Sequence, residues 1–272
     1  MPDTTTPTLP LPGGAIPVLG LGTWQSEGSD AERAVSTALQ LGYAHVDTAT
    51  GYGNEAQVGR ALATRGISRD DVFLTTKLPP DHAGRERQTL TESLAALGTD
   101  HLDLWLVHWP PGGEARPDVW QHLREARDEG LVRSIGGSNY SIAQIDELIA
   151  ATGEAPAVNQ IPWSPVDHDP ALLAAHRERG VVVEGYSPLK RTDLAAEPIV
   201  AAARAHGVTP AQVVLRWHVE HGVVVIPKSV RRERIEENLA VLGFALTPDE
   251  VAEISALDRG GEGITDSDAF GH

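Results

Sequence analysis

The stretch AHVDTATGYGNEAQVGRALATRGISRDDVFLTTK, residues 44–77, decides the predicted fold. It opens with the apolar run AHVD at 44–47 and closes with VFLTTK at 72–77, and both runs have the length of a strand. Between them, residues 54–66 carry apolar side chains at helical spacing, and we expect Gly66 to end that helix. Because a crossover of this length joins parallel strands, the stretch predicts a parallel βαβ unit.

The same alternation extends in both directions along the chain. Strand-length apolar runs occur at 19–23, 44–47, 72–77, 102–108, 132–139, 156–160, 181–187 and 223–229. Helical stretches lie between them, and eight strands each followed by a helix predict an α/β fold of the (β/α)₈ TIM-barrel type. The doubly wound fold is the main alternative. Its G-x-G-x-x-G fingerprint is absent, because Gly20 and Gly22 are followed by Thr23 and Trp24 with no third glycine in register.

Cap residues predict where two of the helices begin and end. The helix at 29–42 is expected to begin at Ser29 or Asp30 and to end at Gly42. A last helix follows Thr247, with Pro248 at its first position.

The domain organisation predicted from these patterns is a single barrel. We expect residues 1–8 to form a disordered tail and residues 9–272 to form one (β/α)₈ domain, with an N-terminal β-hairpin turning at Gly13–Gly14. Residues 190–200 are expected to be an inserted loop, and residues 260–272 a flexible surface tail.

Composition excludes several classes of protein. The chain has 272 residues, 22 Lys plus Arg, 38 Asp plus Glu and no Cys, which gives a formal charge of 22 − 38 = −16. The missing cysteines exclude disulfides, thiolate catalysis and Cys-ligated metals. The acidic balance argues against binding to nucleic acid or to anionic membranes. With no signal peptide and no apolar run of 18 residues, the sequence predicts a soluble cytoplasmic protein.

Polar residues end seven of the eight predicted strands. They are Asp47, Lys77, His108, Ser138–Asn139, Asn159–Gln160, Tyr186–Ser187 and Lys228–Ser229. Strand ends also become polar where a chain emerges into solvent, but a near-buried charge is costly unless it is paired. An acid, a lysine and a histidine on three successive strands therefore indicate an active site on the rim where barrel enzymes place theirs.

Three of these rim residues, together with Tyr52 in the loop five residues after Asp47, predict general-acid catalysis. Lys77 is expected to reach both Asp47 and Tyr52, to lower the pKa of the Tyr52 phenol and to be held charged by Asp47. His108 lies on the next strand, where it can donate or relay a hydrogen bond. Such a cluster can protonate an oxygen that is gaining negative charge.

A second set of residues lies further round the rim and is suited to holding a nucleotide. Ser138, Asn139 and Gln160 can hold a planar carboxamide, and Tyr186 can stack on an aromatic ring. Lys228, Ser229 and Arg234 surround the start of a predicted helix, where phosphate binding is favoured. For Arg231 and Arg232, a solvated basic helix face is an equally good interpretation. No metal site is expected, because His218 and His221 lack a third ligand.

The chain resembles the aldo-keto reductases over nearly its full length, most closely the short-loop bacterial branch of 2,5-diketo-D-gluconate reductases. The resemblance is carried by GLGTW, HVDTATGYGNE, TTKL, LVHWP, SIGGSNY, VNQ, GYSPL and PKSVRRERIEEN. It implies a barrel that binds NADPH, a catalytic tetrad of Asp47, Tyr52, Lys77 and His108, and Tyr52 as the proton donor. The cofactor contacts that it implies are Gly22, Thr23, Ser138, Asn139, Gln160, Tyr186, Ser187, Leu189, Lys228, Ser229, Val230, Arg234, Glu237 and Asn238.

The chain also departs from the family pattern. Gly137 stands where the family usually has Val, a change expected to open a cavity. Residues 162–165, Pro-Trp-Ser-Pro, replace the usual wall next to Gln160, and Lys190 replaces the common Gly after Ser-Pro-Leu. Trp24 and Trp109 are expected to contact substrate, and with Trp163 to give the pocket apolar walls. Trp120 and Trp217 are expected to fill space between barrel and helices.

These observations predict an NADPH-dependent reductase that converts an aldehyde or ketone into an alcohol. Two alternatives stay open at this point: a lyase that forms a Schiff base through Lys77, and a non-catalytic NADPH-binding subunit that senses redox state. The expected partner is a small carbonyl substrate, and we expect the protein to be a monomer.

Overall fold

The computed structural model describes residues 6–63 and 66–260. A single eight-stranded parallel sheet lies at its centre, with the strands in chain order. They are β3 Leu21–Gly22, β4 His45–Asp47, β5 Phe73–Leu78, β6 Leu102–Val107, β7 Val132–Ser138, β8 Val158–Pro162, β9 Val182–Tyr186 and β10 Val224–Val225. Parallel bridges from Leu19 to Val225 and from Gly22 to Lys228 join the two edges, so the sheet closes into the predicted barrel.

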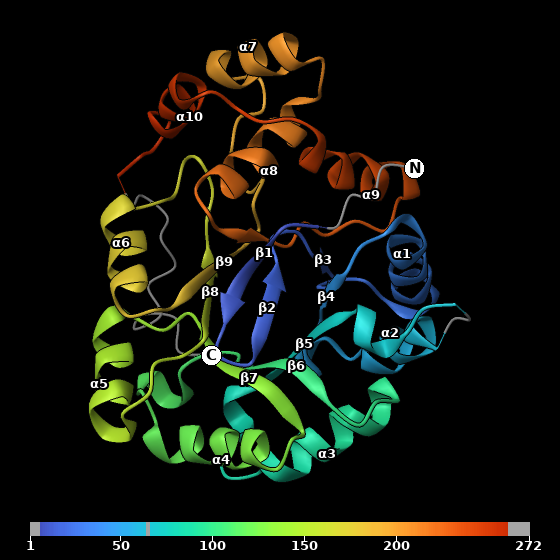
Figure 1. Cartoon of the computed structure of the whole chain (residues 1–272), viewed down its shortest axis with the longest axis vertical. Coiled ribbons are helices and arrows are strands. Elements are labelled where there is room, and N and C mark those ends of the chain that lie inside the picture. Colours follow the sequence, from blue (N-terminus) through green and yellow to red (C-terminus); the bar gives the residue numbers. More distant parts are fainter. Residues whose placement is uncertain (1–5, 64–65, 261–272) are drawn as a thin grey trace.

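Helices surround this sheet on all sides (Figure 1). They are α1 Gly28–Leu41, α2 Glu55–Leu62, α3 Glu86–Leu97, α4 Pro117–Asp128, α5 Ile142–Thr152, α6 Pro170–Glu178, α7 Glu197–His206, α8 Pro210–Glu220, α9 Arg232–Leu239 and α10 Pro248–Ser255. The predicted inserted loop at 190–200 is shorter than expected, because α7 begins at Glu197. Helices α7 and α10 lie on the outer side of α8 (Figure 1).

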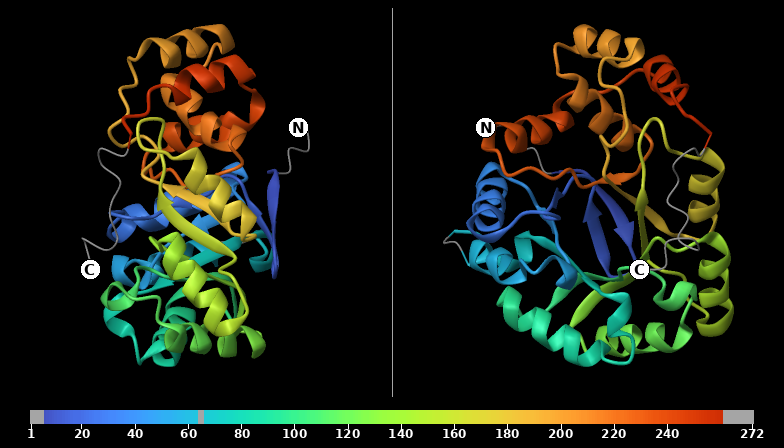
Figure 2. Two further views of the ribbon diagram at one scale, coloured as in Figure 1. Left: turned by 90° about the vertical axis from the view of Figure 1, so that its left-hand side faces the viewer. Right: turned by 180° about the vertical axis from the view of Figure 1, so that it is seen from behind.

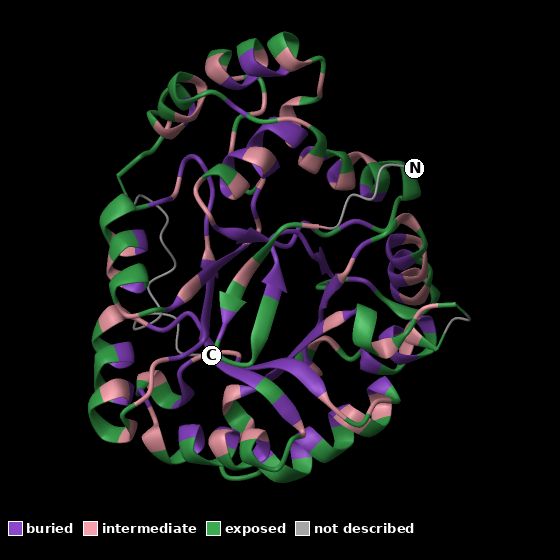
Figure 3. Ribbon diagram, viewed as in Figure 1, coloured by how far each residue is buried: buried purple, intermediate pink, exposed green. Residues whose placement is uncertain are grey.

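Strand β6 shows why the strands of the barrel read as apolar runs. Its alternate residues Leu104 and Leu106 pack with side chains from other strands in the barrel interior. Trp105 and Val107 point the other way and pack in the cluster between the sheet and the helices. Both faces of the strand are therefore covered, which is typical of parallel sheets. The buried residues of the helices lie on the sides that face the sheet (Figure 3).

An antiparallel hairpin closes one end of the barrel. Its strands are β1 Thr8–Leu11 and β2 Gly14–Pro17, which confirms the predicted hairpin; its turn is at Pro12–Gly13, one residue before the predicted position. Leu11 and Ile16 pack against the interior cluster at the amino ends of the strands. The hairpin lies across that end of the barrel and stands apart as one edge of the molecule in side view (Figure 2).

The structure corrects several predicted boundaries. β1 begins at Thr8, inside the predicted tail, whose residues 1–5 lie outside those described, as do residues 261–272. Gly42 ends α1 as predicted, but that helix begins at Gly28. Helix α2 ends at Leu62 with Ala63 as its cap, so Gly66 does not end it. The spacing of apolar residues alone does not fix the last residue of a helix.

Candidate active site

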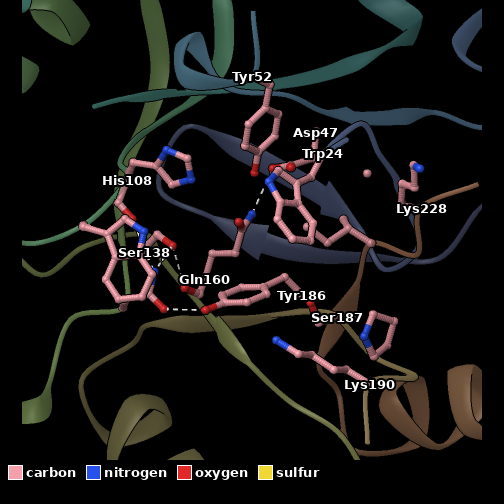
Figure 4. A pocket seen from close by; sticks show the side chains of 15 residues that line it. Trp24, Asp47, Tyr52, His108, Ser138, Gln160, Tyr186, Ser187, Lys190 and Lys228 are labelled. Carbon is pink, nitrogen blue, oxygen red and sulfur yellow. Dashed lines mark hydrogen bonds between the residues drawn. The ribbon is translucent and has the colours of Figure 1, made fainter. Parts of the chain in front are cut away.

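A cavity of about 360 Å³ opens at the carboxyl end of the barrel, away from the hairpin. It contains most of the predicted rim residues (Figure 4). Its walls are formed by Gly22, Trp24, Asp47, Tyr52, His108, Trp109, Ser138, Asn139, Gln160, Tyr186, Ser187, Pro188, Lys190, Ile226 and Lys228. Because most of these residues end a strand or follow one, the fold itself brings them together.

The predicted Asp47–Lys77–Tyr52 cluster is assembled at the floor of this cavity. Lys77 Nζ donates to Asp47 Oδ1 at 2.6 Å and to the Thr48 carbonyl oxygen at 2.8 Å. The same nitrogen lies 3.4 Å from the Tyr52 hydroxyl. The Lys77 side chain is fully buried, yet its pKa is raised, because Asp47, Tyr52 and Glu184 outweigh the effect of burial. Lys77 is therefore an ammonium group held between Asp47 and Tyr52.

The pKa of Tyr52 corrects one expectation. Burial raises the pKa of the phenol and is the largest effect; Lys77 lowers it, while Asp47 and Glu184 raise it further. The net direction is upward, opposite to the predicted decrease, because the sequence does not show how deeply the phenol is buried. Tyr52 is consequently a neutral phenol that has a proton to donate.

His108 faces Tyr52 across the cavity. The two ring centroids are 5.5 Å apart, with an angle of 72° between the ring planes. Burial, aided by Lys77, lowers the pKa of His108 to about 3. His108 is therefore a neutral imidazole at neutral pH, with one N–H to donate and one nitrogen to accept.

The amide and hydroxyl residues form a connected network on the opposite wall. Ser138 Oγ donates to the Gln160 carbonyl oxygen at 2.9 Å, and Asn139 Nδ2 donates to Ser138 Oγ at 2.9 Å. The Tyr186 hydroxyl donates to Asn139 Oδ1 at 2.9 Å, which fixes the tyrosine ring along the cavity wall (Figure 4). The Gln160 side chain bonds to Asp47, so this wall is linked to the acid cluster.

The predicted phosphate-binding residues lie at the far end of the cavity and beyond it. Lys228 lines the cavity and is exposed, and it makes no ion pair with any residue that the structure describes. Arg234 is exposed on the first turn of α9, and Ser229 Oγ accepts from the Arg231 backbone N–H just before that helix. The other predicted contacts here, outside the cavity lining, are Ser229 (buried), Val230 (exposed), Glu237 (bonded to the Thr209 hydroxyl) and Asn238 (buried).

Three more predicted contacts lie close to the cavity. Gly22 lines it, and a Cβ there would lie 2.8 Å from the Ile226 carbonyl oxygen, so barrel closure at this point requires glycine. Thr23 is buried below it and donates through Oγ1 to the Asp47 carbonyl oxygen at 3.0 Å. Leu189 follows the cavity-lining Pro188 but packs into the helix-side core.

Two expectations about the departures from the family pattern are wrong. Trp163 is buried and does not line the cavity; it stacks on Trp217 at 6.5 Å between centroids. Because Gln160 points into the cavity and side chains alternate along a strand, Trp163 points outward to α8. Gly137 leaves no cavity either, since the Tyr140 ring fills the space, with Cδ2 2.6 Å from where a Cβ would stand. The burial predicted for Trp120 and Trp217 is confirmed.

Some residues of the site were missed from the sequence. Pro188 and Ile226 line the cavity. Glu184 on β9 is fully buried directly behind Gln160, and Gln160 Nε2 donates to Glu184 Oε2 at 2.8 Å. Burial, followed by repulsion from Asp47, raises the pKa of Glu184 to about 8. The signal was present in the strand VVVEGY, where a charged residue stands inside an apolar run.

Comparison with known proteins identifies the family. A profile of the aldo/keto reductase family matches residues 18–259. An aldo-keto reductase of Mycolicibacterium smegmatis is 43% identical over 252 residues, covering 91% of this chain and 92% of the relative. Methylglyoxal reductase DkgA of Salmonella typhimurium is 42% identical over 263 residues, covering 95% and 96%. The crystal structure of a Bombyx mori aldo-keto reductase in complex with NADP superposes with a TM-score of 0.87 at 33% identity, covering 94% of each chain.

A barrel that holds a charged lysine beside a neutral tyrosine at its carboxyl rim defines an acid–base catalytic site. The chain belongs to the aldo/keto reductase family, which confirms the predicted fold, family and oxidoreductase class. Among the described residues, no group of His, Asp and Glu side chains has the arrangement of a metal site. None of the helices in the described ranges is long and apolar enough to cross a membrane.

Proposed function

We propose that this protein uses NADPH to reduce an aldehyde or ketone to an alcohol, with Tyr52 as the general acid. The observation that carries the proposal is the Tyr52 hydroxyl on the cavity floor, 3.4 Å from a buried lysine that Asp47 holds charged. The complex of the Bombyx mori relative with NADP and the name of the Salmonella relative support it.

The residues on the cavity walls fit a nicotinamide dinucleotide. Ser138, Asn139 and Gln160 offer amide and hydroxyl groups for the carboxamide, and the Tyr186 ring offers a stacking surface. Lys228 and Arg234, with Ser229, are the proposed ligands of a 2′-phosphate. Both cations are exposed, and neither forms an ion pair with a residue that the structure describes, which supports this proposal. The remaining proposed contacts are Gly22, Thr23, Ser187, Leu189, Val230, Glu237 and Asn238. When bound, NADPH supplies the hydride.

The proton is supplied by the chain's own residues. A substrate carbonyl oxygen bonded to Tyr52 and His108 receives the Tyr52 proton as the hydride reaches the carbonyl carbon. The phenolate that remains is stabilised by the Lys77 ammonium, which Asp47 and the Thr48 carbonyl oxygen hold in place. Trp24 and Trp109 form apolar walls for the rest of the substrate.

The structure gives no support to the Schiff-base alternative. Lys77 is fully buried, its raised pKa keeps it charged, and Asp47, Thr48 and Tyr52 engage its nitrogen. An imine requires an accessible, neutral amine. A cytoplasmic location, a monomeric state and the absence of nucleic-acid binding stay predictions from sequence.

Replacement of Tyr52 by Phe tests the proposed acid. We expect kcat to fall by roughly 10²- to 10⁴-fold, because the substrate oxygen loses its proton donor, while NADPH binding is retained. NADPH oxidation is followed by absorbance with dicarbonyls, sugar ketones, aromatic aldehydes and steroids as substrates. The same assay with NADH tests Lys228 and Arg234, because NADH lacks the 2′-phosphate that they are proposed to bind. Tyr43→Phe is the matched control, since its hydroxyl bonds to the Ile235 carbonyl oxygen in the core.

Full turnover in Tyr52→Phe would rule out Tyr52 as the acid. Tight NADPH binding without turnover of any carbonyl by the unaltered protein would favour the redox-sensing alternative.

A further inference from the structure

Glu184 occupies a position inside the barrel that the reaction as described does not use. Its side chain is fully buried on β9, among groups on β4, β5 and β8. Oε2 accepts from Gln160 Nε2 at 2.8 Å, whereas Oε1 has no hydrogen-bond partner and lies 3.6 Å from His45 Nε2. A buried carboxyl with a single polar bond costs stability, so its presence requires a physical reason.

The Gln160 side-chain nitrogen donates two hydrogen bonds, and the bond to Glu184 is one of them. Gln160 Nε2 also donates to Asp47 Oδ2 at 2.9 Å (Figure 4). Together with the bond to Glu184, this directs both hydrogens of the Gln160 amide at carboxyl groups. A rotated amide would place the Gln160 oxygen against these two acceptors. The two carboxyl groups therefore set the orientation of the amide, and Oε1 of Gln160 is left to accept a hydrogen bond on the cavity side.

We propose that Glu184 is a positioning residue that, together with Asp47, holds the Gln160 amide with its oxygen presented to the cofactor pocket. This inference rests on the proposed function, since the group presented to Gln160 would be the NH₂ of the nicotinamide carboxamide. An oxygen fixed in this way accepts a donor and rejects a group that has none.

The charges around Glu184 are compatible with this role. His45 and Asp47 face it from β4, Lys77 from β5 and Gln160 from β8. Burial, followed by repulsion from Asp47, raises its pKa, so Glu184 and Asp47 flank one amide with less repulsion than two full charges would have. A proton on Oε1, which has no hydrogen-bond partner, leaves Oε2 as the acceptor for Gln160 Nε2. His45 is neutral as well, because burial lowers its pKa to about 3.

A pair of cofactors that differ in one donor tests the inference. NADP⁺ carries the carboxamide NH₂, whereas 3-acetylpyridine adenine dinucleotide phosphate carries a methyl group in its place. Dissociation constants are measured by quenching of tryptophan fluorescence, because Trp24 and Trp109 line the cavity. We expect the unaltered protein to bind NADP⁺ about three- to tenfold more tightly than the analogue, the equivalent of one hydrogen bond.

Variants at Glu184 separate positioning from folding. Glu184→Met removes the acceptor and is expected to bring the ratio of the two constants close to one, whereas Glu184→Gln keeps an acceptor oxygen of equal reach and retains the ratio. If Glu184→Met fails to fold, Glu184→Asp draws the acceptor back from Gln160 and should lower the ratio. Glu55→Gln is the matched control, since Glu55 is a buried carboxyl that bonds to Thr76 and Ser93 instead.

The outcomes distinguish this inference from the proposed function. Binding of neither dinucleotide by the unaltered protein would contradict the proposed function. Binding of both without preference, or an undiminished ratio in folded Glu184→Met, would overturn the role of Glu184 and leave the function standing. Loss of the ratio in folded Glu184→Gln would also overturn it, because an acceptor is then present without effect.

Discussion

At Gly137, a missing side chain is compensated by a neighbouring ring. Tyr140 is buried, and its ring carbons stand 2.6 and 3.0 Å from the point that a Cβ at Gly137 would occupy. The Tyr140 hydroxyl reaches the Ala115 carbonyl oxygen at 3.4 Å, so the ring is held at its far end too. The strand end beside Ser138 and Asn139 is therefore closely packed, and glycine is required there by lack of space.

Gly137→Ala is expected to lower the free energy of unfolding by about 1–3 kcal/mol, because the added methyl must displace the Tyr140 ring. Urea denaturation followed by circular dichroism measures the change. Gly243→Ala is the control, because a Cβ at that exposed position meets no atom within 4 Å. Equal stability of the two variants would show that the Tyr140 ring moves aside freely.

Other residues of the site differ in how far the sequence revealed them. Asp47, Lys77 and His108 could be placed because parallel strands bring their carboxyl ends to one rim, so sequence position alone fixes their neighbourhood. The direction of the Tyr52 pKa shift depends on how deeply the phenol is buried, and the packing at Gly137 depends on the ring of Tyr140. Neither can be read from the local sequence. Glu184 was missed because it lies inside its strand and does not end it, and its pairing with Gln160 depends on the register between β8 and β9.

Among the elements, α10 shows a helix start that local sequence determines. Thr247 Oγ1 accepts from the Glu250 backbone N–H, and the Glu250 side chain accepts from the Thr247 backbone N–H. Pro248 follows at the first helical position, as predicted. All the groups involved lie within four residues, so no tertiary contact is needed to specify this end. The α2 end, by contrast, could not be placed from its own residues.

Thr247→Ala should therefore destabilise the protein by about 1 kcal/mol, because the first turn of α10 loses its cap. The melting temperature measured by calorimetry reports the loss. Thr91→Ala provides the comparison, since Thr91 lies inside α3 and its hydroxyl only bonds back to the Arg87 carbonyl oxygen. A loss in Thr91→Ala as large as that in Thr247→Ala would contradict a specific capping effect.

For the whole molecule, His218 connects the helical layer to the barrel. Its Nε2 lies 2.8 Å from the Trp163 carbonyl oxygen after β8, and its Nδ1 lies 2.8 Å from the Val214 carbonyl oxygen within α8. Burial lowers the pKa of His218 to about 4 and outweighs these two bonds, which favour the charged ring. The unfolded chain therefore binds more protons at this residue than the folded one below pH 6.5.

Stability should accordingly fall as the pH drops from about 6.5 toward 4, and His218 should contribute about 2 kcal/mol of the loss between pH 7 and pH 5. Urea denaturation at both pH values, for the unaltered protein and for His218→Gln, isolates this share, because other titrating groups cancel in the double difference. An unchanged difference in the variant would mean that His218 is already charged in the folded protein.

The hairpin of β1 and β2 determines at which end the barrel is open. Leu11 and Ile16 pack at the amino end and close it. The cavity therefore opens at the carboxyl rim, where the catalytic residues lie. Residues at the closed end pack against one another, whereas the open rim has Trp24, Lys190 and Lys228 on exposed loop segments. Substrate preference can therefore be altered by exchanging Trp24 or Lys190 at the open rim, with little effect on the core that closes the amino end.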